Sequence, residues 1–505
     1  MELFDLDQPI IELVSATEKN YWTIRHAVEG VQIFGGIGSG KTSGSGRMLA
    51  LKYLKAGFGG LVLTVKPDEK KAWQDYCQIT GRTNDLIILE PGGKHSFNFL
   101  QYESARGGSQ GAITENIVDV LKTVIRAGEE KSSGKSDDPF WETALDMLIF
   151  NVIDLCKLAY GNISVQEMYN IVQTIPKGEE NIASKSDDDV IKPFQKAFEA
   201  ARQNVTVQID TWFETLPSSE RTRLQQSDTF ETELIEAVPD ARLLKFLDQF
   251  FFDNFIGLSE KTRSIIDFTF SGFLFRLLRE PVYSLFCRHP LSTVTPEDSL
   301  KGKIILVNLP VKLFHKVGRD CQILFKYIWQ RAMEQRQITD HSRPLFLWAD
   351  EAQNFLHEHD ADYQATARSS RISTVYISQN LPNYYASMGG KQGEYKVKSF
   401  LGTLGTKIFH ANADMETNRY SSELIGDAFF EEQSDSVTYS RQFSKSKSTS
   451  LKIDRIVRPE EFARLRTGGP NNKFWVEGYL HRQGDVVARD QNYIKMLFNQ
   501  NYKPQ

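Results

Sequence analysis

The chain has 505 residues, of which 40% are hydrophobic and 25% are charged, and its formal net charge is -5. This composition is that of a globular protein with room for about two to four domains, or for one large domain with an insertion. The net negative charge excludes a histone-like blanket of positive charge, so we expect any contact with nucleic acid to be local, such as the lining of a channel.

The first predicted strand, residues 31–34, leads into the sequence GGIGSGKT, which fits the pattern G-x-x-x-x-G-K-[ST]. Its glycines let the loop turn back so that backbone N–H groups face one anion, and the following helix adds the positive end of its dipole. We expect Lys41 to reach the β- and γ-phosphates of ATP and Thr42 to offer its hydroxyl to Mg²⁺. A glycine-rich turn without a ligand is disfavoured by the strand before it and the helix after it. The residues predicted to bind the nucleotide are Gly35, Gly36, Ile37, Gly38, Ser39, Gly40, Lys41, Thr42 and Ser43.

Two more strands are predicted at 61–65 and 86–89, and the alternation with helical segments indicates βαβ units. From 105 to 290 the pattern becomes helical. The clearest helical face repeats at steps of four and three and consists of Leu145, Ile149, Val152, Cys156 and Ala159. Strands resume near 303, 344, 373 and 406. The sequence therefore predicts an α/β protein with one mainly parallel sheet, formed by residues 1–104 and 291–505 and interrupted by an all-α insertion at 105–290.

The strand near 344 has the sequence LFLWADE and ends in two acidic residues. An acid at the carboxyl end of a parallel strand lies in the crevice where such folds hold ligands. We expect Asp350 to hold Mg²⁺, directly or through water, and Glu351 to polarise the attacking water. Gln379 ends the next strand, where its amide either senses the γ-phosphate or the water, or is simply a polar strand end.

Four cysteines, at 77, 156, 287 and 321, are far apart and lack metal-site spacing, which is typical of reduced cytosolic thiols. No stretch reaches the roughly 18 uninterrupted apolar residues of a membrane-spanning helix. The first residues are acidic, whereas a signal peptide begins with basic residues. We therefore expect a cytoplasmic protein that associates with a membrane only through a partner.

Several motifs, in this order and spacing, make the chain resemble the HerA/FtsK superfamily of hexameric DNA translocases. Within it, the chain is similar to type IV coupling proteins of the TraG/TraD kind, which feed DNA into conjugative secretion channels. The segments that carry the resemblance are RHAVEGVQIFGGIGSGKTS, LVLTVKPDE, DDPFWETALDMLI, LSEKTRSIIDFTFSGFL, GKIILVNLP, LWADEAQNF, ARSSRISTVYISQN, LGTKIFHANADMETNRYSSELIG and RPEEFARLRTGG.

The resemblance implies a RecA-like motor domain, interrupted by an all-α domain, that assembles into a ring with nucleotide sites between subunits. In the family an arginine eleven residues before the strand-end glutamine acts on the neighbouring subunit's nucleotide, and that position here is Arg368. Arg371, on or near the strand, is the competing candidate. We prefer Arg368 because a finger that crosses an interface belongs on the helix or loop leading into the strand.

The family also implies DNA in a central pore and a relaxase, nuclease or secretion-channel protein as partner. Coupling proteins usually begin with transmembrane helices, whereas this chain has about thirty residues before the phosphate loop. Either a partner supplies the anchor, or the chain is a soluble HerA-like relative that moves DNA in mobilisation, repair or defence.

Three further segments support less specific predictions. The run His357-Glu358-His359-Asp360 is predicted to be a solvated helix face rather than a metal site, since successive helical residues point in different directions. The serine-rich segment 434–450 is a flexible linker, a DNA-facing loop or an exposed hairpin. Lys66, Lys70 and Lys71 either face DNA in the lumen of a ring or are solvated loop lysines.

Two functions of different classes remain. The chain is either an ATP-driven motor that threads DNA through a ring, or a nucleotide-dependent switch or scaffold that docks a protein cargo. Glu351 and an arginine acting in trans are the parts that fast turnover in a ring requires, so the sequence favours the motor.

Overall fold

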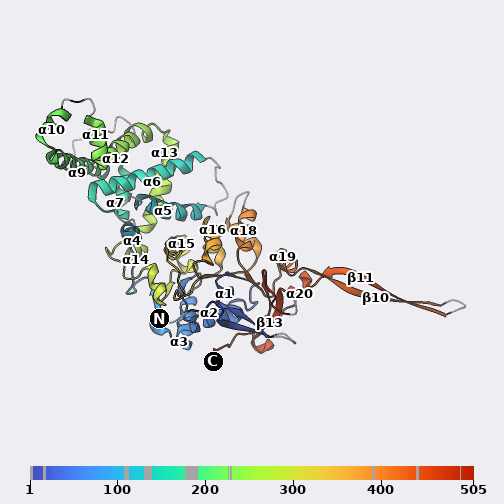
Figure 1. The fold of residues 1–505 in the computed structure, drawn as a ribbon. Coiled ribbons are helices and arrows are strands. Elements are labelled where there is room, and N and C mark those ends of the chain that lie inside the picture. The colour runs from blue at the N-terminus through green and yellow to red at the C-terminus, as the bar shows by residue number, and fades with distance from the viewer. Residues whose placement is uncertain are drawn as a thin grey trace. The chain divides into compact units, whose positions relative to one another are not determined.

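The computed structural model describes residues 4–14, 19–106, 113–129, 139–176, 191–225, 227, 230–388, 393–439, 443–488 and 491–504 (Figure 1). The chain divides into two compact units. One comprises Met1–Ile88 and Pro296–Gln505, and the other comprises Leu89–Glu129 and Gly134–Thr295.

A nine-stranded sheet forms the centre of the first unit. Its strands are β3 (Val31–Phe34), β4 (Gly59–Leu63), β5 (Leu86–Leu89), β6 (Ile304–Val307), β7 (Leu345–Asp350), β8 (Ile372–Ser378), β9 (Thr406–Phe409), β12 (Trp475–Arg482) and β13 (Tyr493–Asn499). Their order is β13-β12-β9-β3-β8-β7-β4-β6-β5. The pairs from β9 across to β6 are parallel, whereas β12 runs antiparallel to both of its neighbours. The predicted α/β fold with a mainly parallel sheet is confirmed.

These parallel strands are buried along their whole length and are mostly apolar, because helices cover both faces of such a sheet. The helices of this unit are α1 (Ile24–Ala27), α2 (Arg47–Lys55), α3 (Glu69–Ile79), α15 (Val311–Glu334), α16 (Asp360–Ala367), α17 (Leu381–Met388), α18 (Gly393–Gly402), α19 (Met415–Ile425) and α20 (Pro459–Ala463). Short 3-10 turns lie at Thr83–Asp85, Pro296–Lys301, Ala352–Asn354 and Pro470–Asn472, and a π-helical turn lies at Thr42–Gly46.

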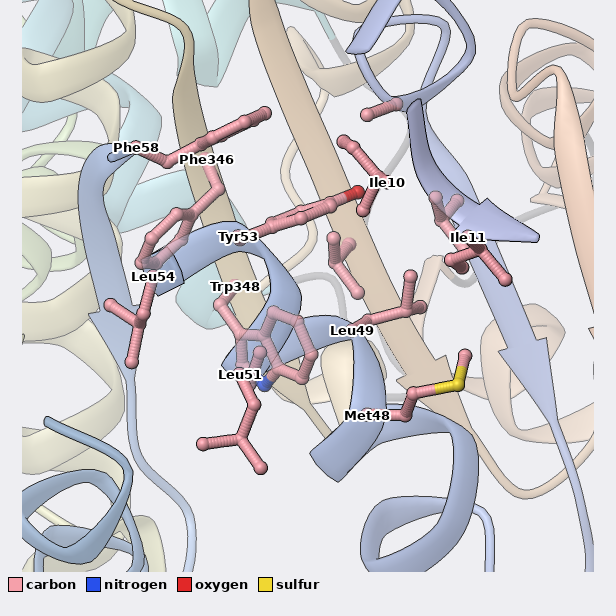
Figure 2. Packing of buried hydrophobic residues seen from close by; sticks show 14 of the residues in the cluster. Ile10, Ile11, Met48, Leu49, Leu51, Tyr53, Leu54, Phe58, Phe346 and Trp348 are labelled. Atoms are coloured by element: carbon pink, nitrogen blue, oxygen red, sulfur yellow. The ribbon is translucent and has the colours of Figure 1, made fainter. Parts of the chain in front are cut away.

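Helix α2, which follows the phosphate loop, packs its apolar face on the sheet. Leu49 and Tyr53 are fully buried, and the Tyr53 ring stacks on Phe58 with ring centroids 4.6 Å apart (Figure 2). The Tyr53 hydroxyl lies 2.8 Å from the Ser373 hydroxyl on β8. A buried tyrosine needs such a partner, so this contact fixes the helix, and with it the loop, on the sheet.

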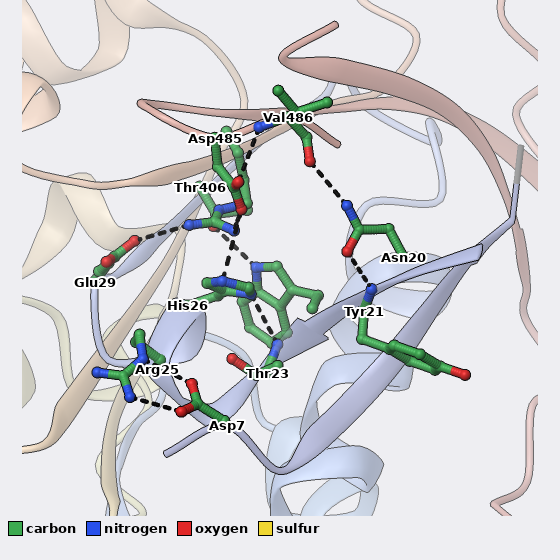
Figure 3. Close-up of polar contacts among 12 residues, drawn as sticks. Asp7, Asn20, Tyr21, Thr23, Arg25, His26, Glu29, Thr406, Asp485 and Val486 are labelled. Carbon is green, nitrogen blue, oxygen red and sulfur yellow. Dashed lines mark hydrogen bonds and ion pairs between the residues drawn. The ribbon is translucent and has the colours of Figure 1, made fainter. Parts of the chain in front are cut away.

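An antiparallel hairpin that the sequence did not indicate, β1 (Pro9–Val14) and β2 (Lys19–Thr23), packs on the same core through Ile10, Ile11 and Trp22. Polar contacts fasten it to distant segments of the unit (Figure 3). Asn20 Nδ2 donates to the Val486 carbonyl at 2.8 Å, and the Trp22 indole donates to Thr406 Oγ1 at 3.0 Å. The N-terminal hairpin is therefore an integral part of the first unit.

The second unit is helical in its described residues, apart from the last residue of β5. Its helices are α4 (Phe99–Arg106), α5 (Ile113–Glu129), α6 (Pro139–Tyr160), α7 (Val165–Thr174), α9 (Pro193–Thr215), α10 (Ser218–Gln225), α11 (Phe230–Ala237), α12 (Pro239–Asp248), α13 (Glu260–Leu277) and α14 (Val282–Phe286), with a π-helical segment at Gln249–Phe255. The predicted face of α6 is buried at Ile149, Val152, Cys156 and Ala159 and half-buried at Leu145.

The contacts divide the chain at Leu89 and Thr295, whereas the sequence prediction divides it at 105 and 290. The segments that enter and leave the helical unit are bonded to one another. Thr293 N donates to Ser96 O at 2.9 Å, and Asn98 N donates to Ser292 Oγ at 3.0 Å. Residues before α4 therefore belong with the helices by their contacts, although they lack a helical pattern.

Within the described part of the chain, no helix taken alone is both long enough and apolar enough to cross a bilayer. One pair, Phe140–Tyr160 and Val165–Thr174, satisfies length and composition only when the two helices are taken together, and they meet at a bend of 112°.

A separate two-stranded sheet contains the serine-rich segment. β10 (Asp427–Tyr439) and β11 (Phe443–Arg455) pair antiparallel, from Asp427 opposite Arg455 to Tyr439 opposite Phe443. Residues 440–442 lie outside the described residues. Of the three alternatives for 434–450, the backbone adopts the hairpin.

Candidate nucleotide-binding site

Four neighbouring strands of the sheet end at the same edge and carry the predicted site residues. β8 lies between β3 and β7, and β4 pairs with the other side of β7. All four run parallel, so the loop after β3, Gln379 after β8, the acids at the end of β7 and Lys66 after β4 meet at this edge. The sequence predicted the first three of these, but not Lys66.

The phosphate loop leaves β3 and winds directly into helical turns at Thr42–Gly46 and then α2. Gly38 and Gly40 have φ angles of +73° and +82°, which favour glycine, and a Cβ on Gly40 would overlap the Val476 side chain of β12. Ser39 is buried and its hydroxyl has no hydrogen-bond partner in the described structure, whereas Ile37 is 89% exposed. This backbone has the shape that a phosphate cradle at a helix N-terminus requires.

Both ends of the phosphate loop are held by residues from elsewhere in the unit. Gly36 N donates to the Ala411 carbonyl after β9 at 2.8 Å, and Gly35 N lies 3.3 Å from the Ser378 carbonyl at the end of β8. Ser43 is exposed and accepts a hydrogen bond from Gln500 Nε2 at 2.6 Å. The position of the loop therefore depends on three strands that are distant in sequence.

Asp350 and Thr42 form a direct contact: the Thr42 hydroxyl donates to Asp350 Oδ2 at 2.8 Å. Asp350 Oδ1 accepts from the N–H of Glu351 at 2.9 Å, and both acids are buried. A hydroxyl beside a carboxylate, with no nitrogen or sulfur ligand, is an oxygen donor set that suits Mg²⁺. The residues present therefore fit the metal that the sequence predicts.

Glu351 occupies the left-handed region of backbone space, with φ 51° and ψ 49°. This conformation is uncommon for a residue with a side chain, and such strain persists where the surroundings fix it. Gln353 Nε2 donates to Glu351 Oε2 at 2.9 Å, and Gln379 Nε2 lies 3.3 Å from Oε1. Lys41 Nζ lies 3.9 Å from the same Oε1. The carboxylate is thus oriented by two amides and faces the phosphate-loop lysine.

Gln353 was missed by the sequence reasoning, although it stands two residues after Glu351 in the segment LWADEAQNF. Its carbonyl oxygen accepts from the Ser378 hydroxyl at 3.0 Å while its amide nitrogen donates to Glu351. Gln353 therefore connects the end of β8 to the acid at the end of β7.

Lys66 lies at the two acids rather than in a solvated loop. Its Nζ is 3.6 Å from Asp350 Oδ2 and 3.9 Å from Glu351 Oε1. Partial burial disfavours its charge, but the surrounding carboxylates, of which Asp350 and Glu351 act most strongly, together outweigh burial and raise the pKa of Lys66. Lys71, by contrast, is exposed on α3. Of the lysines that were grouped in sequence, Lys66 therefore contacts both candidate site acids, whereas Lys71 lies on the exposed surface.

A buried histidine supports the helix behind the loop. His410 Nδ1 lies 2.8 Å from the Glu477 carbonyl, and Nε2 lies 2.7 Å from the Ser45 hydroxyl. A carbonyl only accepts, so Nδ1 carries the proton and Nε2 accepts from Ser45. Burial lowers the pKa of His410 to about 4, which keeps the ring neutral at pH 7.

This histidine predicts a pH dependence of stability. Between pH 6.5, the value for an exposed histidine, and about 4, the unfolded chain binds a proton that folded His410 does not. The free energy of unfolding should therefore fall as the pH falls through this window, by on the order of 3 kcal/mol from this group.

Urea unfolding of wild type and His410→Gln at pH 7 and pH 5 measures this contribution. Glutamine keeps one donor and one acceptor but does not titrate, so its stability should change less between the two pH values. The remaining buried histidines are present in both proteins and cancel in the comparison. Equal pH dependence in the two proteins would show that His410 does not carry the effect.

The two candidate finger arginines have different environments. Arg368 follows α16, its side chain is 64% exposed, and Nη2 lies 3.7 Å from Glu29 Oε1. Arg371 is buried with φ 51°, and its Nη1 donates to the carbonyls of Phe4 at 3.2 Å and Ser342 at 3.1 Å. Arg371 is therefore committed to its own chain, whereas Arg368 is accessible to another molecule.

The prediction of a solvated helix face at 357–360 is wrong. Helix α16 begins only at Asp360, and His357 and Asp360 are both buried. Asp360 pairs with Lys326 Nζ of α15 at 2.6 Å, and His357 Nε2 lies 3.0 Å from Gln330 Oε1. A charged group buried with its counter-ion forms a polar core network. The described residues contain no group of three potential metal ligands.

Comparison with known proteins gives one family match. Residues 344–467, from β7 through the hairpin β10–β11, match the family described as the TraM recognition site of TraD and TraG. No curated protein sequence matches the chain.

Among solved structures, the bacterial conjugative coupling protein TrwBdeltaN70 in its unbound monoclinic form is 14% identical, with a TM-score of 0.57 over 95% of this chain and 86% of that one. The plasmid coupling protein TrwB with ADP and Mg²⁺ is also 14% identical, with a TM-score of 0.57 over 96% and 88%. TrwB with the GTP analogue GDPNP is 14% identical as well, with a TM-score of 0.56 over 95% of this chain and 89% of that one. The chain resembles TraG/TraD-type coupling proteins and has their RecA-like fold.

The family match covers only part of the candidate site. The matched residues include Asp350, Glu351, Arg368 and Gln379, whereas the phosphate loop lies outside them. The phosphate loop after β3 and the matched ends of β7 and β8 are therefore far apart in the sequence. The order of the strands brings them together.

Proposed function

We propose that the protein is an ATP-hydrolysing motor that assembles into a ring, a hexamer, and moves DNA in conjugative transfer or mobilisation. The observation that carries the proposal is the convergence of the phosphate loop, Thr42, Asp350 and Glu351 at one edge of the sheet. TrwB, which has the same fold, has been solved with ADP and Mg²⁺, and this supports ATP and Mg²⁺ as the cofactors here.

Each site residue has a distinct role in this proposal. The loop N–H groups and Lys41 bind and neutralise the phosphates, and Thr42 and Asp350 hold Mg²⁺, which offsets phosphate charge when bound. Glu351, oriented by Gln353 and Gln379, takes a proton from the attacking water. Gln379 lies at the strand end from which it senses whether the γ-phosphate is present.

Arg368 completes the site of the neighbouring subunit. Its exposure and its position between α16 and β8 support this role, and the three carbonyls bonded to Arg371 disfavour the alternative. The family match to a TraM recognition site supports a protein partner from the DNA-transfer machinery, such as a relaxase-associated or secretion-channel protein.

The test is ATP hydrolysis by the full chain with and without DNA, using single-stranded and double-stranded DNA separately. A motor hydrolyses ATP severalfold faster when its DNA track is present. A switch or scaffold hydrolyses at a rate that DNA leaves unchanged and that a protein cargo alters, so this result would replace the motor by the second function.

Lys66 gives a more specific prediction. Lys66→Ala should lower kcat about tenfold or more and change ATP affinity little, because the lysine contacts Asp350, which holds Mg²⁺, and Glu351, which activates the water, rather than the loop that binds phosphate. Lys71→Ala removes the same charge from an exposed position of α3 and should hydrolyse ATP normally. If Lys66→Ala hydrolyses normally but loses DNA binding, the lysine faces DNA instead.

A further inference from the structure

The hairpin β10–β11 has no covering layer in the described structure. It is a sheet of two strands that pairs with neither the nine-stranded sheet nor β1–β2, so each strand has an open hydrogen-bonding edge. A two-stranded hairpin is marginally stable in water by itself, and long open edges are templates for pairing with another chain. Both properties indicate that the hairpin functions against a partner.

One face of the hairpin near its base is apolar and exposed. Phe429 and Ile453 are opposite each other in the register, and Leu451 lies two residues from Ile453 on the same face. Their exposed fractions are 71%, 61% and 70%. Contiguous exposed apolar side chains of this size mark an interaction surface.

The two strands carry opposite charge. β10 has four acidic residues and no basic residue, whereas β11 has four basic residues and one acidic residue. Arg455 pairs with Asp427 of the same hairpin at 2.9 Å. Glu431 and Glu432 on β10, and Lys447 and Lys452 on β11, form no ion pair within the described part of the chain. One edge of the hairpin is therefore acidic and the other is basic.

We propose that the hairpin pairs with the hairpin of a second copy of this chain, with the acidic β10 edge of one subunit against the basic β11 edge of the next. The contact joins two different edges, so it is heterologous and repeats around a ring. The added strand neighbours satisfy the open hydrogen-bonding edges of both strands. This inference rests on the ring of the proposed function and assigns it a contact outside the nucleotide site.

DNA fits the hairpin less well. Over residues 427–455 the sequence has five basic residues and five acidic residues, and β10 would face the phosphates with negative charge. The charge separation between strands instead matches a second hairpin of the same kind.

The experiment reverses the charge of one strand at a time in the full chain. At the four substituted positions, Glu431→Lys/Glu432→Lys places lysine on both edges of the hairpin, and Lys447→Glu/Lys452→Glu places glutamate on both edges. Each variant alone should fail to form the ring, as measured by native mass spectrometry with a non-hydrolysable ATP analogue present. An equimolar mixture should recover it, because at these four positions each edge of one variant then meets the opposite charge on the other variant, and the two chains should alternate.

The mixture separates contact between subunits from damage within one hairpin. Repulsion between the strands of a single hairpin is the same in the mixture as in each variant alone, so a loss that mixing does not repair overturns the proposal. Rings formed by each variant alone also overturn it. Loss of DNA binding by the Lys447→Glu/Lys452→Glu variant with unchanged assembly would assign the hairpin to DNA.

Nucleotide binding and DNA-stimulated hydrolysis by the wild type are measured in parallel. If DNA stimulates hydrolysis by the wild type but charge reversal leaves assembly unchanged, the motor function stands and the hairpin contact is refuted. If the wild type stays a single chain with the ATP analogue, the ring and the hairpin contact are both refuted. If the ring forms and depends on the hairpin charges but DNA does not stimulate hydrolysis, only the motor function is refuted.

Discussion

Glu351→Gln is expected to bind ATP nearly as tightly as the wild type and to hydrolyse it about 10²- to 10⁴-fold more slowly. The substitution keeps the size of the side chain, and its single amide oxygen can still accept from one of the two amides, Gln353 or Gln379. It removes the negative charge and with it the capacity to take a proton from water. The bound ATP should therefore accumulate, which a filter-binding assay with labelled nucleotide measures directly.

Lys41→Ala should differ from Glu351→Gln in kind. The lysine follows the loop that cradles the phosphates, so its loss weakens nucleotide binding as well as hydrolysis.

The matched control for Glu351→Gln is Glu416→Gln, which makes the same change at an exposed acid on α19 and should behave like the wild type. Brisk hydrolysis by Glu351→Gln would show that another group activates the water, and the next acid at this edge is Asp350.

Arg368→Ala is expected to bind ATP nearly normally and to turn over about 10³-fold more slowly, because the subunit that lacks the arginine keeps its own loop, Thr42, Asp350 and Glu351. The defect lies in the neighbour's site. Mixing Arg368→Ala with Lys41→Ala should therefore restore part of the hydrolysis, since a Lys41→Ala subunit lends its arginine to an Arg368→Ala subunit and completes one site.

Subunit exchange must be demonstrated for this mixture, for instance by co-purification of differently tagged chains. Arg371→Ala is the structural comparison: it removes hydrogen bonds to Phe4 and Ser342 within the chain, so it should lower thermal stability, and mixing should restore nothing. If exchange occurs and the Arg368→Ala mixture stays inactive, the arginine acts within its own subunit or the sites are not shared.

The sequence by itself determined the elements whose signal is local. The phosphate loop is a pattern of consecutive residues between a strand and a helix. The buried parallel strands appear as short apolar runs, and α6 appears as an apolar face with helical spacing. Asp350, Glu351 and Gln379 were found because strand ends carry polar residues into the crevice of a parallel sheet.

Only the tertiary structure decided which of these residues meet. Thr42 and Asp350 are 308 positions apart and Ser45 and His410 are 365 apart, so their contacts depend on the order of the strands, with β8 between β3 and β7. The same order brings Lys66 to the acids, whereas the sequence suggested either a DNA-facing lysine or a solvated loop lysine. The burial of His357 and Asp360 depends on Lys326, which supplies the counter-charge from α15. Local patterns are readable from the sequence because propensity and periodicity act between near neighbours, but the partner of a buried charge is set by packing between distant segments.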